Sequence, residues 1–351
     1  MKLKGSVKAI FPDAALIVFC LGILAACPIR VYQILKLIEP STGFYSDTSN
    51  WSIITLYTIL GICTAVILVF SYLSKNIPAA KLPEGRRIPL AVSGLILSAG
   101  FVTNIFDQVA KIKELASEAG VSASANLIEM IKTSGATLQA VDIVFAALSC
   151  IYMLVFSVSY IVSKKLYSKL KLLALSPLVW AITRVFFRVT KKISFIQVSD
   201  LILELASLIF VMIFFFTFAR VASGINSEGS MWSVYACGIS ASLFILTYSI
   251  PRLMLFITGN SSLINPEAQF EFCDIGIAVF AVTLIVSTLR SGYPMISGEP
   301  DRHITVITAD TAPAADDKNK ADDNNAPAEK ETNKEDNNEK FSDEPVSTKE
   351  E

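Results

Sequence analysis

Residues Trp51–Leu73 read WSIITLYTILGICTAVILVFSYL, 23 positions without a charged side chain. An α-helix rises about 1.5 Å per residue, so a helix of this length spans the roughly 30 Å hydrocarbon core of a bilayer. Seven other stretches of the chain are similarly apolar. The sequence therefore predicts an all-α bundle of about eight transmembrane helices, over residues 14–35, 51–73, 88–106, 141–162, 172–189, 201–221, 234–257 and 272–289.

The composition of the whole chain agrees with this fold class. Of 351 residues, 53% are hydrophobic and 17% are charged, and the mean hydropathy is +0.55. A soluble globular domain carries about 25% charged residues. The composition indicates a multi-pass integral membrane protein whose main surroundings are the lipid bilayer, and we expect no nucleic-acid partner.

The net charge of −1 conceals two parts of opposite charge. Residues 299–351 carry 16 acidic and 7 basic side chains, which leaves 15 acidic and 23 basic ones for residues 1–298. The C-terminal part has only one aromatic residue, Phe341, so it lacks the apolar surface that offsets the entropy of folding. It is either a solvated tail or a segment that recruits a soluble cytoplasmic partner through Phe341, Pro345 and Val346. We therefore expect three regions, which are an N-terminal segment 1–13, a transmembrane domain 14–290 and a disordered acidic tail 291–351.

Two of the predicted segments leave alternatives open. Segment 172–189 is short and contains Arg184 and Arg188, so it could instead lie at the membrane interface, which would leave seven spans. The loop 107–140 that follows the third segment contains two amphipathic stretches, 109–119 and 126–133, the second of which Ser124 could cap.

Basic residues predict the orientation of the chain. Eight spans place both termini on one side, where thirteen Lys and Arg residues lie, against seven on the opposite side. Loops rich in Lys and Arg stay in the cytoplasm, so we expect both termini to be cytoplasmic in a cell-membrane protein. The residues up to Cys27 also fit a lipoprotein cleavage box, and cleavage there would remove the first span.

Cysteine and histidine usage argues against several chemistries. The six cysteines are scattered without a CxxC pair, which indicates neither a zinc site nor a disulfide framework. The single histidine, His303, lies in the acidic tail, away from any apolar segment. We find no catalytic motif, so we expect no enzyme, no cofactor and no metal.

A short pattern recurs near the end of each odd-numbered segment. A polar side chain is followed by an aliphatic residue and then by an aromatic residue or Met, in Pro28–Tyr32, Val102–Phe106, Ile182–Phe186 and Ile250–Met254. Each even-numbered segment is preceded or opened by an acid, which is Asp47, Asp142, Asp200 or Asp274. The chain therefore reads as four out-and-back hairpins in a parallel repeat.

The run Pro28–Gln33, followed by Pro40 and by Thr42–Tyr45, resembles a segment of uncharacterised multi-pass membrane proteins of bacteria. The resemblance covers about 20 residues and a similar spacing of segments. It implies a polytopic membrane protein and carries no activity or site.

Charged residues within the apolar segments are the candidate functional residues, because a charge at the bilayer centre costs ~2.5–3.5 kcal/mol and needs a partner. Asp200 and Glu204 share a helix face, and Glu204 matches the predicted depth of Arg184, so we predict an Arg184–Glu204 ion pair. The full predicted cluster is Arg30, Asn104, Asp142, Arg184, Asp200, Glu204, Arg252 and Asp274.

These charges permit three interpretations: ion pairs that tie the hairpins together, a polar cavity for a charged solute, or arginines that reach lipid phosphates. At the level of function, the sequence favours a non-enzymatic membrane scaffold or assembly factor. A solute transporter or channel is the alternative.

Overall fold

The computed structural model describes residues 3–292 except 42, 48–49, 75–81, 84, 122–125, 191–197, 225–230 and 265–269. These residues belong to one compact unit, residues 1–295. The predicted acidic tail lies outside the described residues from residue 293 onward, and so does Ser124.

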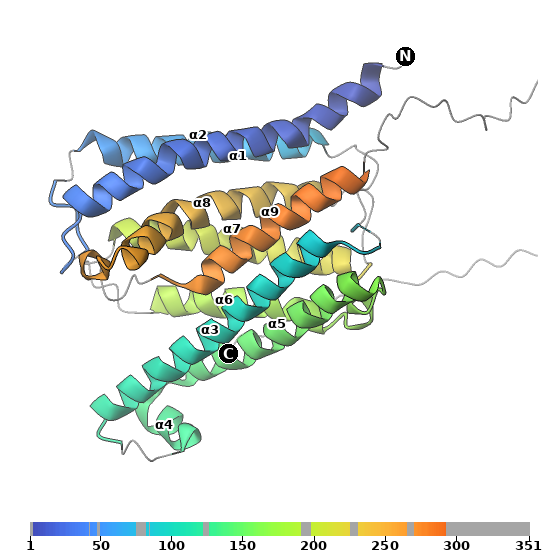
Figure 1. Cartoon of the computed structure of the whole chain (residues 1–351). Helices are drawn as coiled ribbons and strands as arrows, with labels where there is room; N and C mark the ends of the chain where they lie inside the picture. Colours follow the sequence, from blue (N-terminus) through green and yellow to red (C-terminus); the bar gives the residue numbers. More distant parts are fainter. Residues whose placement is uncertain are drawn as a thin grey trace, which may run out of the picture. The chain divides into compact units, whose positions relative to one another are not determined.

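The described part of the chain is an all-α bundle (Figure 1). Its helices are α1 (Leu3–Lys36), α2 (Trp51–Leu73), α3 (Ile88–Glu118), α4 (Leu127–Ser134), α5 (Thr137–Val162), α6 (Ser176–Thr190), α7 (Val198–Ala222), α8 (Met231–Ile257) and α9 (Phe272–Gly292). Among the described helices, seven are long and apolar enough to cross a membrane, namely α1, α2, α3, α5, α7, α8 and α9. The predicted all-α fold is confirmed, and the seven long apolar helices indicate a multi-pass membrane protein.

Helix α6 is shorter than the segment predicted at 172–189. It has 15 residues, which corresponds to roughly 22 Å and is less than the hydrocarbon thickness. A short 3₁₀ turn, Leu173–Leu175, takes up the first part of the predicted segment, and Pro177 then lies in the first turn of α6. Helix α6 nevertheless packs against both α5 and α7.

Helix α3 is longer than predicted, because it continues beyond residue 106 to Glu118. Ile112 and Ala116 lie one turn apart on a buried face and pack against Met130 of α4 and Ala136. This small apolar cluster extends α3 through the predicted amphipathic stretch 109–119 and orders α4, which matches the second stretch. Both predicted amphipathic stretches are therefore helical, the first as the end of α3 and the second as α4.

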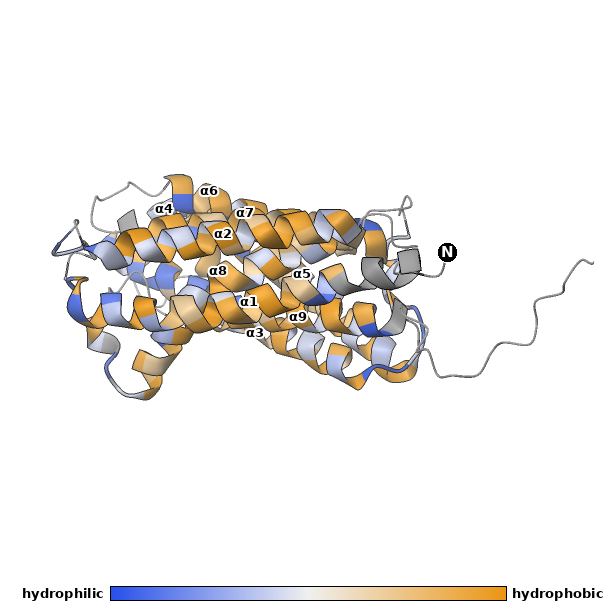
Figure 2. Cartoon of the chain, turned by 90° about the horizontal axis from the view of Figure 1, so that it is seen from above, coloured by the Kyte–Doolittle hydropathy of each residue, from blue (hydrophilic) through white to orange (hydrophobic). Residues whose placement is uncertain are grey.

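Helix α8 lies at the centre of the bundle and contacts α1, α2, α7 and α9. Within its apolar segment 67% of the residues are buried, against 22% in α2. Four rings from α5, α7 and α9 form an aromatic core next to it, namely Phe156, Phe214, Phe218 and Phe280. Hydrophobic residues cover α1 and α2 along their length and hydrophilic ones gather at the two ends of the bundle (Figure 2), as expected of helices that face lipid.

Glycines allow close contacts between helices. A Cβ atom at Gly100 of α3 would lie 2.8 Å from the Cα atom of Cys273 in α9. A Cβ atom at Gly238 of α8 would lie 2.9 Å from Ile285 and 3.0 Å from Phe214. Small residues let backbones approach in membrane bundles, where packing rather than the hydrophobic effect drives association.

We expect Gly100→Ala to destabilise the protein by about 1–3 kcal/mol, because the new methyl group would press against backbone rather than against a movable side chain. The matched control is Gly61→Ala in α2, where a Cβ atom has no neighbour within 4 Å. That control should be neutral or stabilising by up to about 1 kcal/mol. Thermal unfolding of the two detergent-solubilised variants measures these changes in stability. Equal unfolding midpoints for Gly100→Ala and Gly61→Ala would contradict the close α3–α9 contact.

Candidate functional site

The polar residues of the predicted cluster gather at one end of the bundle. This follows from antiparallel packing, because the ends of α1, α3, α6 and α8 lie beside the beginnings of α2, α5, α7 and α9. The four polar residues of the repeated pattern are all buried, with exposed fractions of 0% for Arg30, 3% for Asn104, 7% for Arg184 and 3% for Arg252. The recurring polar position therefore faces the protein and not the lipid.

Glu204 of α7 is the centre of the largest group of charges. Its Oε1 atom accepts a hydrogen bond from Nη2 of Arg252 in α8 at 2.9 Å, and its Oε2 atom lies 2.8 Å from Nη2 of Arg188 in α6. The guanidinium of Arg252 also lies over the ring of Tyr248, 4.9 Å from its centroid. One carboxylate therefore joins three helices.

Arg184 pairs with a different acid, Glu271, which directly precedes α9. Both terminal nitrogens of Arg184 donate to Oε2 of Glu271, and the Nη1 distance is 2.6 Å. The guanidinium also lies 5.4 Å from the centroid of the Trp180 ring. The predicted Arg184–Glu204 pair is therefore wrong, since each of these residues binds another partner.

The physical reason is that depth along a helix does not specify the facing side chain. Arg188, one turn nearer the end of α6, reaches Glu204, and this leaves Arg184 directed at the loop before α9. The sequence analysis missed Glu271 because this residue lies one position before the predicted segment 272–289. It also assigned Arg188 to a loop and not to an apolar segment. The signal that could have found Glu271 is its position immediately before an apolar helix start.

The Arg184–Glu271 pair keeps Glu271 ionised. Burial alone raises the pKa of the Glu271 carboxyl, but Arg184 and then Arg188 outweigh burial and lower that pKa to about 2, from an ordinary value of 4.5. A carboxyl with a lowered pKa stabilises the folded state fully above its ordinary pKa. This contribution is lost as the pH falls through the range from about 4.5 to about 2.

Two further acids of the predicted cluster receive hydrogen bonds from neutral groups. Oδ2 of Asp142 accepts from Nδ2 of Asn104 at 2.9 Å, which links α5 to α3. Oδ2 of Asp274 accepts from the hydroxyl of Tyr248 at 3.0 Å, which links α9 to α8. The Asn104–Asp142 contact joins a repeat residue to the acid that opens the next segment.

Arg30 lies in a separate polar cluster, between α1 and α2. Its Nη1 atom donates to Oε1 of Gln33 and to the hydroxyl of Tyr45, both at 3.0 Å. Nε2 of Gln33 in turn donates to the carbonyl oxygen of Ser52 at 3.0 Å, at the start of α2. The sequence analysis predicted Arg30 as a cluster residue but did not predict that Gln33 and Tyr45 bind it. Both partners lie in the run of residues that resembles other multi-pass membrane proteins.

Asp200 of α7 is the one member of the predicted cluster whose side chain lies outside the described residues, and Asp47 is exposed. In the described ranges, no group of three or more His, Cys, Asp or Glu residues is arranged to hold a metal ion. All six cysteines are free thiols, and Cys27 lies within α1 with its Sγ atom 3.7 Å from the carbonyl oxygen of Leu246 in α8. The described chemistry of this end of the bundle is thus ion pairing and hydrogen bonding.

Comparisons with known proteins return no match, whether with family models, with curated proteins or with solved structures.

Double-mutant cycles should distinguish the observed pairing from the one predicted on depth. Loss of one partner of a buried ion pair costs ~3–5 kcal/mol because the survivor is left buried and unpaired. We expect Arg184→Gln and Glu271→Gln to be coupled, with a cycle energy of about 0.5–3 kcal/mol. In the cycle of Arg184→Gln with Glu204→Gln, the two losses of stability should be closer to additive.

Thermal unfolding in detergent measures these cycles, with Glu114→Gln on the exposed end of α3 as the control for loss of an unburied charge. A larger coupling for Arg184 with Glu204 than with Glu271 would show that the pairing described above is incorrect.

Proposed function

We propose that the chain is a non-enzymatic membrane scaffold or assembly factor. The observation that carries this proposal is that three arginines at one end of the bundle already form ion pairs with carboxylates of the protein. Arg184, Arg188 and Arg252 each bind a carboxylate of the same chain. An anionic solute would have to displace one of these pairs before it could bind an arginine there.

The positions of the pairs fit a structural role. Glu204 connects α7 to α6 and α8, and Glu271 connects the start of α9 to α6. Helix α6 is too short to be fixed by its apolar length alone, so its two arginines supply the contacts that its length does not. Pairing offsets much of the free energy needed to bury these charges. Loss of one partner destabilises the fold, because the remaining charge stays buried without an opposite charge.

Transport is the second candidate, and a specific observation favours it. The hydrogen bonds of Asp142 and Asp274 come from neutral donors, the Asn104 amide and the Tyr248 hydroxyl. Intramembrane acids without a directly bonded cation are the usual proton or cation carriers of transporters. Both acids lie in the same polar region as the ion pairs.

Proteoliposomes and photo-crosslinking test the two candidates together. Purified full-length chain, reconstituted with a pH-sensitive dye inside and an imposed membrane potential, should show no proton flux above protein-free vesicles. A photo-crosslinking residue at Phe341, introduced in the full chain in native membranes, should give a discrete adduct through the acidic tail. Flux that disappears in Asp142→Asn or Asp274→Asn, without an adduct at Phe341, would replace the scaffold by a transporter.

We further propose that α6 crosses the membrane as a short eighth segment, so that the chain forms four hairpins with both termini in the cytoplasm of a cell-membrane protein. Two observations support this: the excess of basic residues on the side of the termini, and the position of the start of α1 at the same end of the bundle as the end of α9 (Figure 1). A short helix is accommodated by local thinning of the bilayer or by flanking basic residues that reach the interface.

Cysteine labelling should confirm this topology. In a cysteine-free variant, we expect a membrane-impermeant maleimide to modify a cysteine at Ser117, at the exposed end of α3, in intact cells. A cysteine at Asn324 in the tail should react only after permeabilisation. Reaction of both positions in intact cells would contradict eight crossings, because seven crossings move the C-terminus to the outside.

A further inference from the structure

The turn between α5 and α6 carries leucine side chains on its surface. Leu172 is 87% exposed, the largest exposed fraction among the large hydrophobic side chains that the structure describes, and Leu170 and Leu175 are each 38% exposed. Single apolar side chains are common on protein surfaces and need no explanation. Three exposed leucines within six residues instead indicate a segment that contacts an apolar medium.

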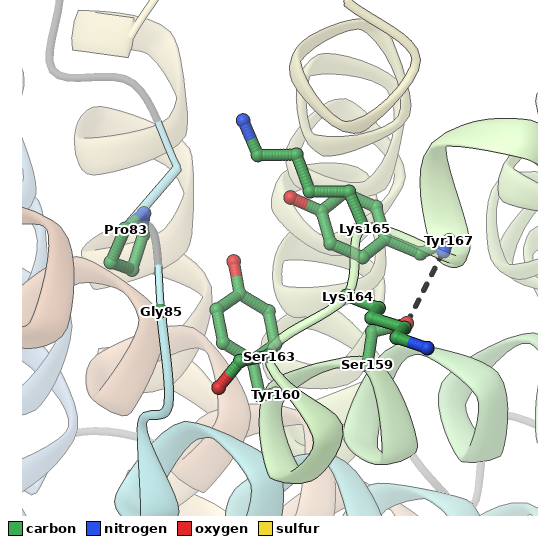
Figure 3. A pocket seen from close by; sticks show the side chains of 8 residues that line it. All are labelled: Pro83, Gly85, Ser159, Tyr160, Ser163, Lys164, Lys165 and Tyr167. Atoms are coloured by element: carbon green, nitrogen blue, oxygen red, sulfur yellow. Dashed lines mark hydrogen bonds between the residues drawn. The ribbon is translucent and has the colours of Figure 1, made fainter.

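The backbone at the start of this turn is fixed to α5, beside the pocket shown in Figure 3. The amide nitrogen of Lys164 donates to the carbonyl oxygen of Ser159 at 3.1 Å, and that of Tyr167 donates to the hydroxyl of Ser159 at 3.2 Å (Figure 3). The rings of Tyr160 and Tyr167 are stacked, with centroids 5.8 Å apart, and both side chains are buried. The start of the turn therefore cannot move away from the bundle without losing these contacts.

The end of the turn is held by the hydrophobic core. Ala174 is buried, and Leu173 is partly buried against the core. The short 3₁₀ turn Leu173–Leu175 contacts both α5 and α7. Because Leu173 and Ala174 occupy the positions that face the protein, the side chain of Leu172 remains on the surface.

Leu172 is also the first residue of a helical path that leads into α6. Its backbone angles (φ −69°, ψ −38°) and those of Ser176 (φ −59°, ψ −41°) are right-handed helical. The amide nitrogen of Leu175 donates to the carbonyl oxygen of Leu172 at 3.1 Å. Pro177 has no amide hydrogen, and in an α-helix its ring would clash with the carbonyl group of Leu173, so the path continues as a tighter 3₁₀ turn.

This path has the length that α6 lacks. A 3₁₀ helix rises about 2 Å per residue, so residues 172–175 add about 8 Å to the roughly 22 Å of α6. The whole path then reaches about 30 Å, which is the thickness of the hydrocarbon core. Leu172 would lie at the boundary of that core.

The lysines beside these leucines fit the same depth. Residues 169–172 read Lys-Leu-Lys-Leu, and both lysines are exposed. A lysine at a membrane boundary lays its alkyl stem along apolar surface and keeps its ammonium group in water. The alternation therefore fits a segment whose leucines enter the acyl region while its lysines reach back to the headgroups.

Exposed apolar side chains on the two neighbouring helices continue this surface. At the end of α5, Val158, Ile161 and Val162 are 43%, 46% and 49% exposed, and Phe216 near the end of α7 is 46% exposed. Both helices are long and apolar enough to cross a membrane, so lipid covers these residues. The turn packs against both helices, and the same lipid therefore lies beside it.

We propose that residues 170–175 are inserted into the lipid leaflet at this end of the bundle, with Leu172 among the acyl chains. The partner is the apolar part of the leaflet and not a soluble ligand. Insertion deepens the proposed crossing of α6, because it supplies the missing length, and it rests on that crossing only for this consequence. The contact of Leu172 with lipid depends on the membrane location of the bundle and can be measured by itself.

Fluorescence quenching tests the insertion. A cysteine-free, full-length variant is reconstituted in phosphatidylcholine vesicles with a bimane label at Leu172→Cys, at Ile161→Cys on the exposed face of α5, or at Lys171→Cys on the same turn. We expect a phosphatidylcholine with a doxyl group on its acyl chain to quench the label at Leu172→Cys as strongly as at Ile161→Cys, and severalfold more than at Lys171→Cys. Iodide on both sides of the membrane should show the opposite order. Unfolding midpoints equal to that of the cysteine-free parent establish that the variants are folded.

Stronger quenching of Leu172→Cys by iodide than by the doxyl lipid would overturn the proposal. Protection from both quenchers in native membrane vesicles would also overturn it, because a protein partner would then cover the turn. Lipid quenching at Leu172→Cys, combined with reaction of both the Ser117 and the Asn324 positions in intact cells, would keep the insertion and refute the crossing of α6. Iodide quenching, combined with the labelling expected for eight crossings, would refute the insertion alone.

Discussion

An arginine buried between apolar helices needs an anionic or polar partner, and this requirement determines how one end of the bundle is assembled. Glu204 satisfies it for Arg188 and Arg252 at once, and Glu271 satisfies it for Arg184. These contacts are directional: Glu204 has to face α6 and α8, and Glu271 has to face α6. They add to the close helix packing at Gly100 and Gly238, which also depends on how each helix is rotated. The charged end therefore helps to specify which helices are neighbours.

The existence of the helices was predictable from the sequence, because a run such as Trp51–Leu73 has the length and composition that a bilayer requires. The end of α3 and the start of α6 were not predictable, because they depend on contacts between segments. Ile112 extends α3 because Met130 and Ala136 are available to cover it, and α6 begins only after the 3₁₀ turn at Leu173–Leu175. The sequence could also place Arg30, Asn104, Arg184 and Arg252 at similar depths, and all four are buried. It could not identify their partners, because a partner depends on the rotation of each helix and Glu271 lies outside the apolar segment.

The two ends of the bundle differ in how their polar groups are satisfied. At the end with Glu204, carboxylates and guanidinium groups of the same chain bond to one another, and Asp142 and Asp274 accept hydrogen bonds from neutral side chains. At the opposite end, backbone groups make the contacts instead: the amide nitrogens of Lys164 and Tyr167 bond to Ser159, and the amide nitrogen of Arg87 donates to the carbonyl oxygen of Tyr160. The first end thus joins helices through charged side chains, and the second joins α3 to α5 through a backbone hydrogen bond.

This difference also bears on the position of α6, the shortest helix that packs between the long ones. Hydrophobic matching alone would hold a helix of roughly 22 Å only weakly across a bilayer of about 30 Å. At one end its arginines bind Glu204 and Glu271. At the other end the turn Leu173–Leu175 packs against both α5 and α7, and it follows directly on the loop that carries Lys165 and Tyr167. The ion pairs at one end and the packing of this turn at the other therefore restrain α6 at both ends, with contacts that its length alone does not provide.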